Sequence, residues 1–207
     1  MAHQEELAAL QEIRNLMQRS SRFTWLSGLS GIVAGIIALV SVGVVYWYLS
    51  QQNLSYADLY QGKLTQETGT FLGLVAGTAL VLALGSVLFL TSLKARKAQE
   101  SIWHIQGQRL FTNLGIPLLA GGVFCLILVH HQLFYLVAPS MLVFYGLALI
   151  NSSKYTFTEL RYLGMGQLIV GLLAGFWIKY GLLAWGVGFG GLNILYEALL
   201  YYKYEKE

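Results

Sequence analysis

One acidic residue, Glu197, lies inside a long apolar stretch of this 207-residue sequence. A carboxylate is costly to place in hydrocarbon, so an acid within a membrane span indicates either a function or a structural partner. Three other polar residues could share its site, namely Asn193, Gln167 and Arg161. Arg161 could pair with the carboxylate, whereas the two amides could line a polar cavity for a proton or small solute. Structural pairing and a ligand site both stay open from the sequence.

The motifs of common catalytic sites are absent from the sequence: it has no H-E-x-x-H, no G-x-S-x-G and no Walker A pattern. His130 and His131 are adjacent, and adjacent side chains diverge on a helix, so they are a poor metal pair. Cys125 is the only cysteine, which excludes an intramolecular disulfide. The glycine-rich segment 186–191 has the letters of a dinucleotide fingerprint but no βαβ unit around it. We therefore predict a protein that is not an enzyme and has no catalytic residue, cofactor or metal ion.

Six apolar stretches fill most of the chain and must position the polar residues. Hydrophobic residues make up 56% of the sequence and charged residues only 11%, whereas a soluble domain has about 25% charged residues. Each stretch is long enough, or nearly so, to cross a bilayer core of about 30 Å as a helix. The predicted spans are 26–49, 70–93, 110–129, 133–150, 162–178 and 181–202. The sequence thus predicts an all-α polytopic membrane protein, a compact bundle of six transmembrane helices forming one domain over residues 24–207.

Basic residues are unevenly distributed over the two sides of this predicted bundle. Eleven of the thirteen lie on the side that the two termini share, and only Lys63 and Lys179 lie on the other. Because basic residues stay on the cytoplasmic side during insertion, both termini are predicted to be cytoplasmic. The short connections at 130–132 and 179–180 predict that helices three and four, and helices five and six, are antiparallel neighbours.

Small residues four positions apart recur within the predicted spans. Such residues let helix backbones approach closely in lipid, where the hydrophobic effect does not drive helix association. The predicted helix-packing residues are Gly31, Gly35, Gly73, Gly77, Gly121, Gly171 and Gly175. The segment 186–191 is either another close-packed face or a locally unwound helix that exposes carbonyl groups. Close packing is the favoured interpretation because glycine is common in membrane helices.

Residues 1–23 are predicted to form a cytoplasmic segment that contains an amphipathic helix over 4–22. Leu7, Leu10, Ile13 and Leu16 follow the three-four rhythm of such a helix. The helix could lie on anionic lipid or contact another protein. We therefore expect the lipid bilayer as a partner, together with a homo-oligomer or a cytosolic protein bound through 4–22. The basic clusters are small and close to the membrane, which argues against nucleic acid.

Several segments carry a resemblance to known proteins. Residues 113–122 read NLGIPLLAGG, 144–151 read FYGLALIN, 159–164 read ELRYLG, and IRNLM at 13–17 precedes SSRF at 20–23. These segments resemble a group of uncharacterised bacterial six-span inner-membrane proteins. The short glycine-rich hairpins are also similar in plan to acid-resistance membrane proteins of the HdeD type. The resemblance implies a location in the bacterial inner (cytoplasmic) membrane and brings no catalytic residues with it.

Two functions from different classes stay open on the sequence. The favoured one is a non-enzymatic integral membrane protein that acts through protein or lipid contacts, as a sensor, regulator or assembly subunit. The alternative is a small-solute transporter, channel or substrate-binding membrane component with a polar site near Glu197. Six spans in 207 residues also resemble the general plan of vitamin-uptake S-components. A membrane enzyme acting on lipid has the least support, because no acid–base pair or nucleophile constellation is visible.

Overall fold

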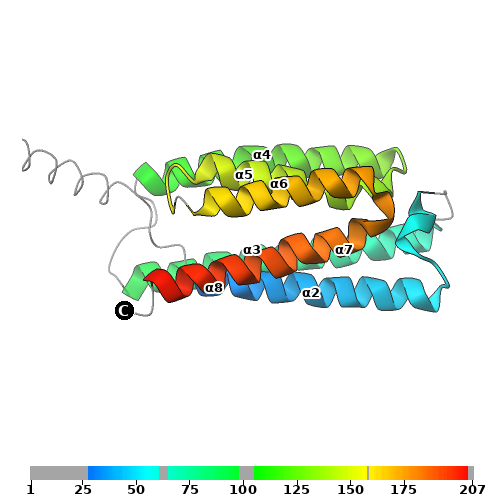
Figure 1. The fold of residues 1–207 in the computed structure, drawn as a ribbon, viewed down its shortest axis with the longest axis horizontal. Helices are drawn as coiled ribbons and strands as arrows, with labels where there is room; N and C mark the ends of the chain where they lie inside the picture. Colours follow the sequence, from blue (N-terminus) through cyan, green and yellow to red (C-terminus); the bar gives the residue numbers. More distant parts are fainter. Residues whose placement is uncertain (1–27, 61–64, 98–104, 158, 205–207) are drawn as a thin grey trace, which may run out of the picture.

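The chain forms a bundle of long helices, seen in a computed structural model that describes residues 28–60, 65–97, 105–157 and 159–204 (Figure 1). The predicted amphipathic helix over 4–22 lies outside these residues. Every element assigned within them is helical. The long α-helices are α2 (Gly28–Gln51), α3 (Gln66–Lys97), α4 (Ile105–His130), α5 (Val137–Ser152) and α6 (Leu160–Phe176). The last part of the chain comprises α7 (Gly181–Trp185), the π-helix η4 (Gly186–Leu192) and α8 (Asn193–Tyr204).

Five segments in the described residues are long and apolar enough to cross a membrane. They are Leu29–Gln51, Gln66–Leu93, Gly107–His130, Phe134–Ser152 and Ile178–Leu200. The remaining predicted span, 162–178, corresponds to α6, which has 17 residues. A helix of that length is about 26 Å long, near the lower limit for crossing a bilayer. The five longer segments indicate a multi-pass membrane protein whose apolar faces contact lipid.

Two layers of helices make up the bundle in Figure 1. One layer holds α4, α5 and α6, and α5 packs against both of its neighbours. The other layer holds α2, α3 and the C-terminal helices, and α2 packs against α3, η4 and α8. The layers are joined where α7 contacts α5 and η4 contacts α6. The C-terminal part of the chain therefore connects the two halves of the molecule.

Tight turns end α2 and α4 at the same end of the bundle. Asn53 and Gln132 take left-handed backbone conformations, with φ of 51° and 63°. The backbone N–H of Leu54 donates to the carbonyl of Leu49 at 2.9 Å, and that of Leu133 donates to the carbonyl of Leu128 at 2.8 Å. These bonds satisfy carbonyls that a helix end would otherwise leave open. The short turn after α4 brings α5 back along it, as the length of the connection predicts.

Three 3-10 helices in the connections, η1 (Tyr56–Leu59), η2 (Phe134–Leu136) and η3 (Ile178–Tyr180), meet at this end of the bundle. The Tyr56 hydroxyl donates to the carbonyl of Tyr135 at 3.2 Å. A Cβ added at Gly181 would lie 2.9 Å from the same hydroxyl oxygen, so glycine makes room for the ring. Burial raises the pKa of the Tyr56 phenol. Tyr56 therefore ties the first connection to the other two.

The predicted packing glycines fall into two groups. A Cβ added at Gly35 would lie 2.5 Å from Cγ1 of Ile194, and one at Gly121 would lie 2.5 Å from Cβ of Phe144. Close contacts of this kind occur at Gly31, Gly35, Gly121 and Gly171. A Cβ would meet no atom within 4 Å among the described residues at Gly73, Gly77 and Gly175. The α3 stripe thus faces open space on the outside of the described bundle, because α3 packs on α2 through other residues.

Candidate functional site

A polar cluster lies inside the bundle, formed by Tyr145 of α5, Gln167 of α6, and Asn193 and Glu197 of α8. Gln167 is fully buried, Asn193 and Glu197 are buried, and Tyr145 is half-buried. Three of these four residues are those that the sequence singles out. Gln167 and Glu197 are 30 positions apart in the sequence, and the fold brings them into one buried site.

The side-chain amide of Gln167 links α6 to the last part of the chain. Its Nε2 atom donates to the carbonyl of Gly188 at 2.8 Å and to Oδ1 of Asn193 at 3.2 Å. A side-chain hydrogen bond joins Asn193 to Tyr145, which also lies within electrostatic range of Glu197. Polar groups in a bilayer need partners, and here they find them across three helices. The cluster thus connects α5, α6 and α8.

The π-helix η4 positions one acceptor of this cluster. A π-turn replaces the usual i→i−4 bonds with i→i−5 bonds, which changes where the local carbonyl groups lie. Gly188, in the middle of η4, presents its carbonyl to Gln167. A Cβ at Gly188 would lie 2.6 Å from Oε1 of Gln167, so only glycine leaves room for the amide. The segment 186–191 is therefore close-packed and remains helical, but with π rather than α geometry.

Glu197 lies against the backbone of α2. A Cβ added at Gly31 would lie 2.7 Å from Oε1 of Glu197, so the absence of a side chain at Gly31 provides the space for the carboxylate. One turn further along α2, Gly35 packs against Ile194 in the same way. The glycine stripe of α2 therefore forms the surface on which α8 and Glu197 pack.

Arg161 does not join the cluster. It is exposed in the first turn of α6, and no ion pair links it to Glu197 in the part of the chain that the structure describes. Tyr196 makes a different contact between the same two helices, because its hydroxyl donates to the carbonyl of Glu159. Structural pairing of Arg161 with Glu197, one of the two sequence-based interpretations, therefore does not describe this fold.

Two further observations concern polar side chains inside the bundle. Nδ2 of Asn151 donates to the carbonyl and to Oδ1 of Asn113, at 3.0 and 3.1 Å, and so joins α5 to α4. Oε1 of Gln167 is buried and has no hydrogen-bond partner within the described residues. The Asn151 pair is a closed contact, whereas the polar cluster retains an acceptor that a proton donor could use.

Sequence reasoning missed one member of the cluster, Tyr145. This tyrosine lies in a segment rich in aromatic and aliphatic residues, and its spacing from neighbours carries no signal of a polar role. Only the packing of α5 against the C-terminal helices brings it to Asn193. Helical spacing is the one available signal. Tyr145 lies three residues after Leu142 and four before Leu149, so it shares a face of α5 with these two buried leucines.

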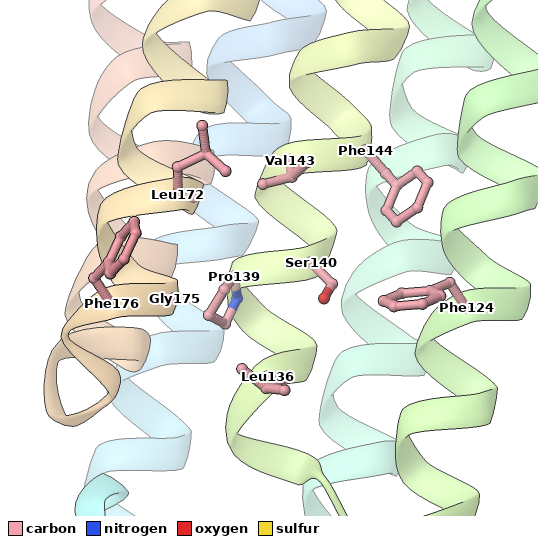
Figure 2. A pocket seen from close by; sticks show the side chains of 10 residues that line it. Phe124, Leu136, Pro139, Ser140, Val143, Phe144, Leu172, Gly175 and Phe176 are labelled. Carbon is pink, nitrogen blue, oxygen red and sulfur yellow. The ribbon is translucent and has the colours of Figure 1, made fainter.

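A groove opens on the other side of α5, between α4 and α6 (Figure 2). It has a volume of about 360 Å³. Its lining residues are Phe124, Leu136, Pro139, Ser140, Val143, Phe144, Gly171, Leu172, Gly175 and Phe176. A smaller pocket of about 160 Å³ lies between α6 and α7 and is also lined by apolar and aromatic residues, including Val170 and Val187. No member of the polar cluster lines either pocket.

The chemistry available in these sites is limited. No group of three histidine, cysteine, aspartate or glutamate side chains could hold a metal ion among the residues that the structure describes. The polar cluster can exchange hydrogen bonds, and the groove is lined by apolar side chains apart from Ser140. Comparison of the chain with protein-family models, with curated proteins and with solved structures finds no match.

Proposed function

We propose that this chain is a non-enzymatic integral membrane protein that acts through contacts with lipid or with other proteins, as a sensor, regulator or assembly subunit. In this proposal six helices cross a bacterial inner membrane, α6 among them, and both termini are cytoplasmic. The partner is a second copy of the chain or a cytosolic protein, bound through residues 4–22. The uneven distribution of basic residues supports this orientation.

One contrast between the inside and the outside of the bundle carries the proposal. Inside, Gln167 and Asn193 bond to each other and to neighbouring groups. Outside, large apolar surfaces remain without partners in the described chain, as shown by Leu74 and Val81 of α3, each 69% exposed. A molecule whose buried amides mostly bond to one another and whose exterior is apolar is suited to contacts at its surface.

Crosslinking in native membranes tests this proposal. We expect the intact protein to form a specific crosslinked species that is lost in the double variant Leu10→Gln, Leu16→Gln, which removes two residues of the predicted apolar stripe. The matched control is Gln11→Ala, Gln18→Ala on the same segment, which should retain the species. Equal crosslinking in both variants, with equal amounts of protein in the membrane, would exclude a contact function for residues 4–22.

A second candidate function is a small-solute transporter, channel or substrate-binding component. The π-helix η4 and the buried acceptor Oε1 of Gln167 favour it, since π-turns and interrupted helices recur at binding sites. Solute or proton flux into liposomes is the measurement, with Glu197→Gln as the variant and Glu67→Gln, an exposed acid at the start of α3, as the control. Flux that is the same in both variants would reject the site at Glu197.

A further inference from the structure

The groove between α4, α5 and α6 lies within the apolar part of these helices (Figure 2). Phe124 on α4 and Phe144 on α5 form one wall, with ring centroids 5.6 Å apart. Leu172 and Phe176 on α6 form the other wall, and Phe176 is 84% exposed. Both walls belong to helices whose apolar faces contact lipid, so the groove opens into the hydrocarbon layer rather than into water.

Small residues create the groove. Gly175 on α6 and Ser140 on α5 both line it. A Cβ added at Gly175 would meet no atom within 4 Å in the described chain, although the same helix packs tightly at Gly171. The space beside Gly175 is therefore left unfilled by the protein's own side chains, and a larger side chain there would fill it without displacing the helices.

The chemistry of the groove lining points to one kind of occupant. Ser140 is the only lining residue with a polar side chain, so water would find too few hydrogen-bond partners. The groove is open along its length and lined by apolar side chains apart from Ser140, which suits an extended hydrocarbon chain.

A cation lies just beyond the end of the α6 wall. Lys179 follows Phe176 by three residues, is exposed, and has its Nζ atom 4.7 Å from the centre of the Tyr180 ring. A lysine and a tyrosine at this position suit the level of lipid headgroups. We propose that the groove binds one acyl chain of a phospholipid whose phosphate lies beside Lys179. This inference deepens the lipid-contact part of the proposed function and rests on the membrane placement given there.

Photo-crosslinking can test the occupant directly. The full-length protein is reconstituted into vesicles of phosphatidylethanolamine and phosphatidylglycerol that contain a phospholipid with a diazirine in its acyl chain. Labelled peptides are then quantified by mass spectrometry. We expect labelling of Val143 and Leu172 to fall at least fivefold in Gly175→Leu. The matched control is Gly77→Leu on α3, where a Cβ also meets no atom within 4 Å, and this variant should retain the labelling.

A second variant keeps the test informative if Gly175→Leu folds poorly. Ser140→Leu fills the groove from the α5 side and should reduce the same labelling, while thermal unfolding in detergent reports whether either variant is folded. Groove labelling that is unchanged in a folded Gly175→Leu or Ser140→Leu protein overturns the proposal. Crosslinks from the groove to a second protein copy would overturn it as well.

Two arms of the experiment separate the remaining outcomes. A diazirine-labelled free fatty acid should label the groove less than the phospholipid does, and Lys179→Gln should abolish the difference. Equal labelling by both lipids in the unaltered protein overturns a phospholipid source. Labelling at Leu74 and Val81 of α3 reports membrane embedding alone. If these residues are labelled and the groove is not, only this inference fails; if neither is labelled, the proposed membrane function fails as well.

Discussion

Glycines have different surroundings in the α5–α6 interface and on α3: they lie at a helix contact in the first and face outward in the second. Gly146 and Gly164 face each other across α5 and α6, where a Cβ on either would lie 2.6 or 2.7 Å from the carbonyl oxygen of the other. Gly73 and Gly77 on α3 also lie four residues apart, but a Cβ on either would meet nothing within 4 Å in the described chain. Only 6% of the apolar stretch of α3 is buried, against 33% of Ile178–Leu200.

This difference shows that small-residue spacing alone does not identify a helix interface. Spacing places two glycines on one face of a helix, but the rotation of that helix in the bundle decides whether the face meets a neighbour. In α5 and α6 the face meets a backbone. In α3 it faces open space outside the described bundle. Substitutions at matched glycines should therefore separate the two regions clearly.

The largest effect is expected at Gly164. Replacement by alanine forces its Cβ against the carbonyl of Gly146, which is backbone and cannot move aside. We expect a loss of about 2–3 kcal/mol in unfolding free energy, measured by denaturation in micelles. Gly77→Ala is the control and should change stability by less than about 0.5 kcal/mol. Similar losses at the two positions would show that the two regions do not differ as described.

The buried polar cluster should give the next largest effect. Asn193→Leu removes the acceptor of Gln167 and the partner of Tyr145, and we expect a loss of about 1–2 kcal/mol. Asn151→Leu removes only the half-buried bonds to Asn113 and should cost less, about 0.5–1 kcal/mol. The same unfolding measurement compares the two variants. A larger loss from Asn151→Leu would contradict the central place given to the cluster.

A smaller effect is expected at Gly31, because the obstructing atoms there belong to a flexible side chain. Gly31→Ala should cost about 1 kcal/mol as Glu197 moves away from α2. In a double-mutant cycle, the cost of Gly31→Ala should be smaller by about 0.5–1 kcal/mol when Glu197 is already replaced by alanine. Additive effects of the two substitutions would mean that Glu197 does not rest on Gly31.

The smallest effect concerns Tyr56 and its dependence on pH. Burial raises the pKa of this phenol above its ordinary value of 10.0, so the folded state holds the proton more tightly than the unfolded state. Its contribution to stability is present below about pH 10 and is lost as the pH rises further. Tyr56→Phe should cost about 0.5–1 kcal/mol at neutral pH through loss of the bond to Tyr135.

Alkaline unfolding provides the control for Tyr56. The loss of stability between about pH 8 and pH 11 should be smaller in Tyr56→Phe than in the unaltered protein. Tyr60→Phe, at an exposed tyrosine of the same connection, should leave that loss unchanged. The same alkaline loss in all three proteins would show that Tyr56 ionisation does not act on the fold.

Hydropathy located the long helices because lipid, rather than tertiary contact, decides which segments must be apolar. The first predicted span, 26–49, corresponds to Gly28–Gln51, and the third, 110–129, to Ile105–His130. The helices α3 and α4 begin several residues before the apolar stretches do, since polar residues continue a helix beyond the hydrocarbon. The segment 181–202 was expected as one helix, but it changes geometry at Gly186.

The site was only partly predictable for a physical reason. Polarity inside an apolar span marks a residue as unusual, and this identified Gln167, Asn193 and Glu197. It cannot show which residues meet, because helix rotation and the π-turn are set by packing. Arg161 and Glu197 are therefore reasonable partners in sequence, but Arg161 is exposed and Glu197 is buried in the fold, while Tyr145 carries no polar signal.

The central claim is that all six helices cross the membrane, including the 17-residue helix α6. If so, the connections on either side of α6 lie on opposite sides of the membrane. Single-cysteine variants Lys154→Cys and Lys179→Cys, in a protein with Cys125→Ser, can be treated with a membrane-impermeant maleimide on intact spheroplasts. We predict labelling of the Lys179→Cys protein at once and of the Lys154→Cys protein only after permeabilisation. Labelling of both from the outside, or of neither, would contradict the six-span bundle.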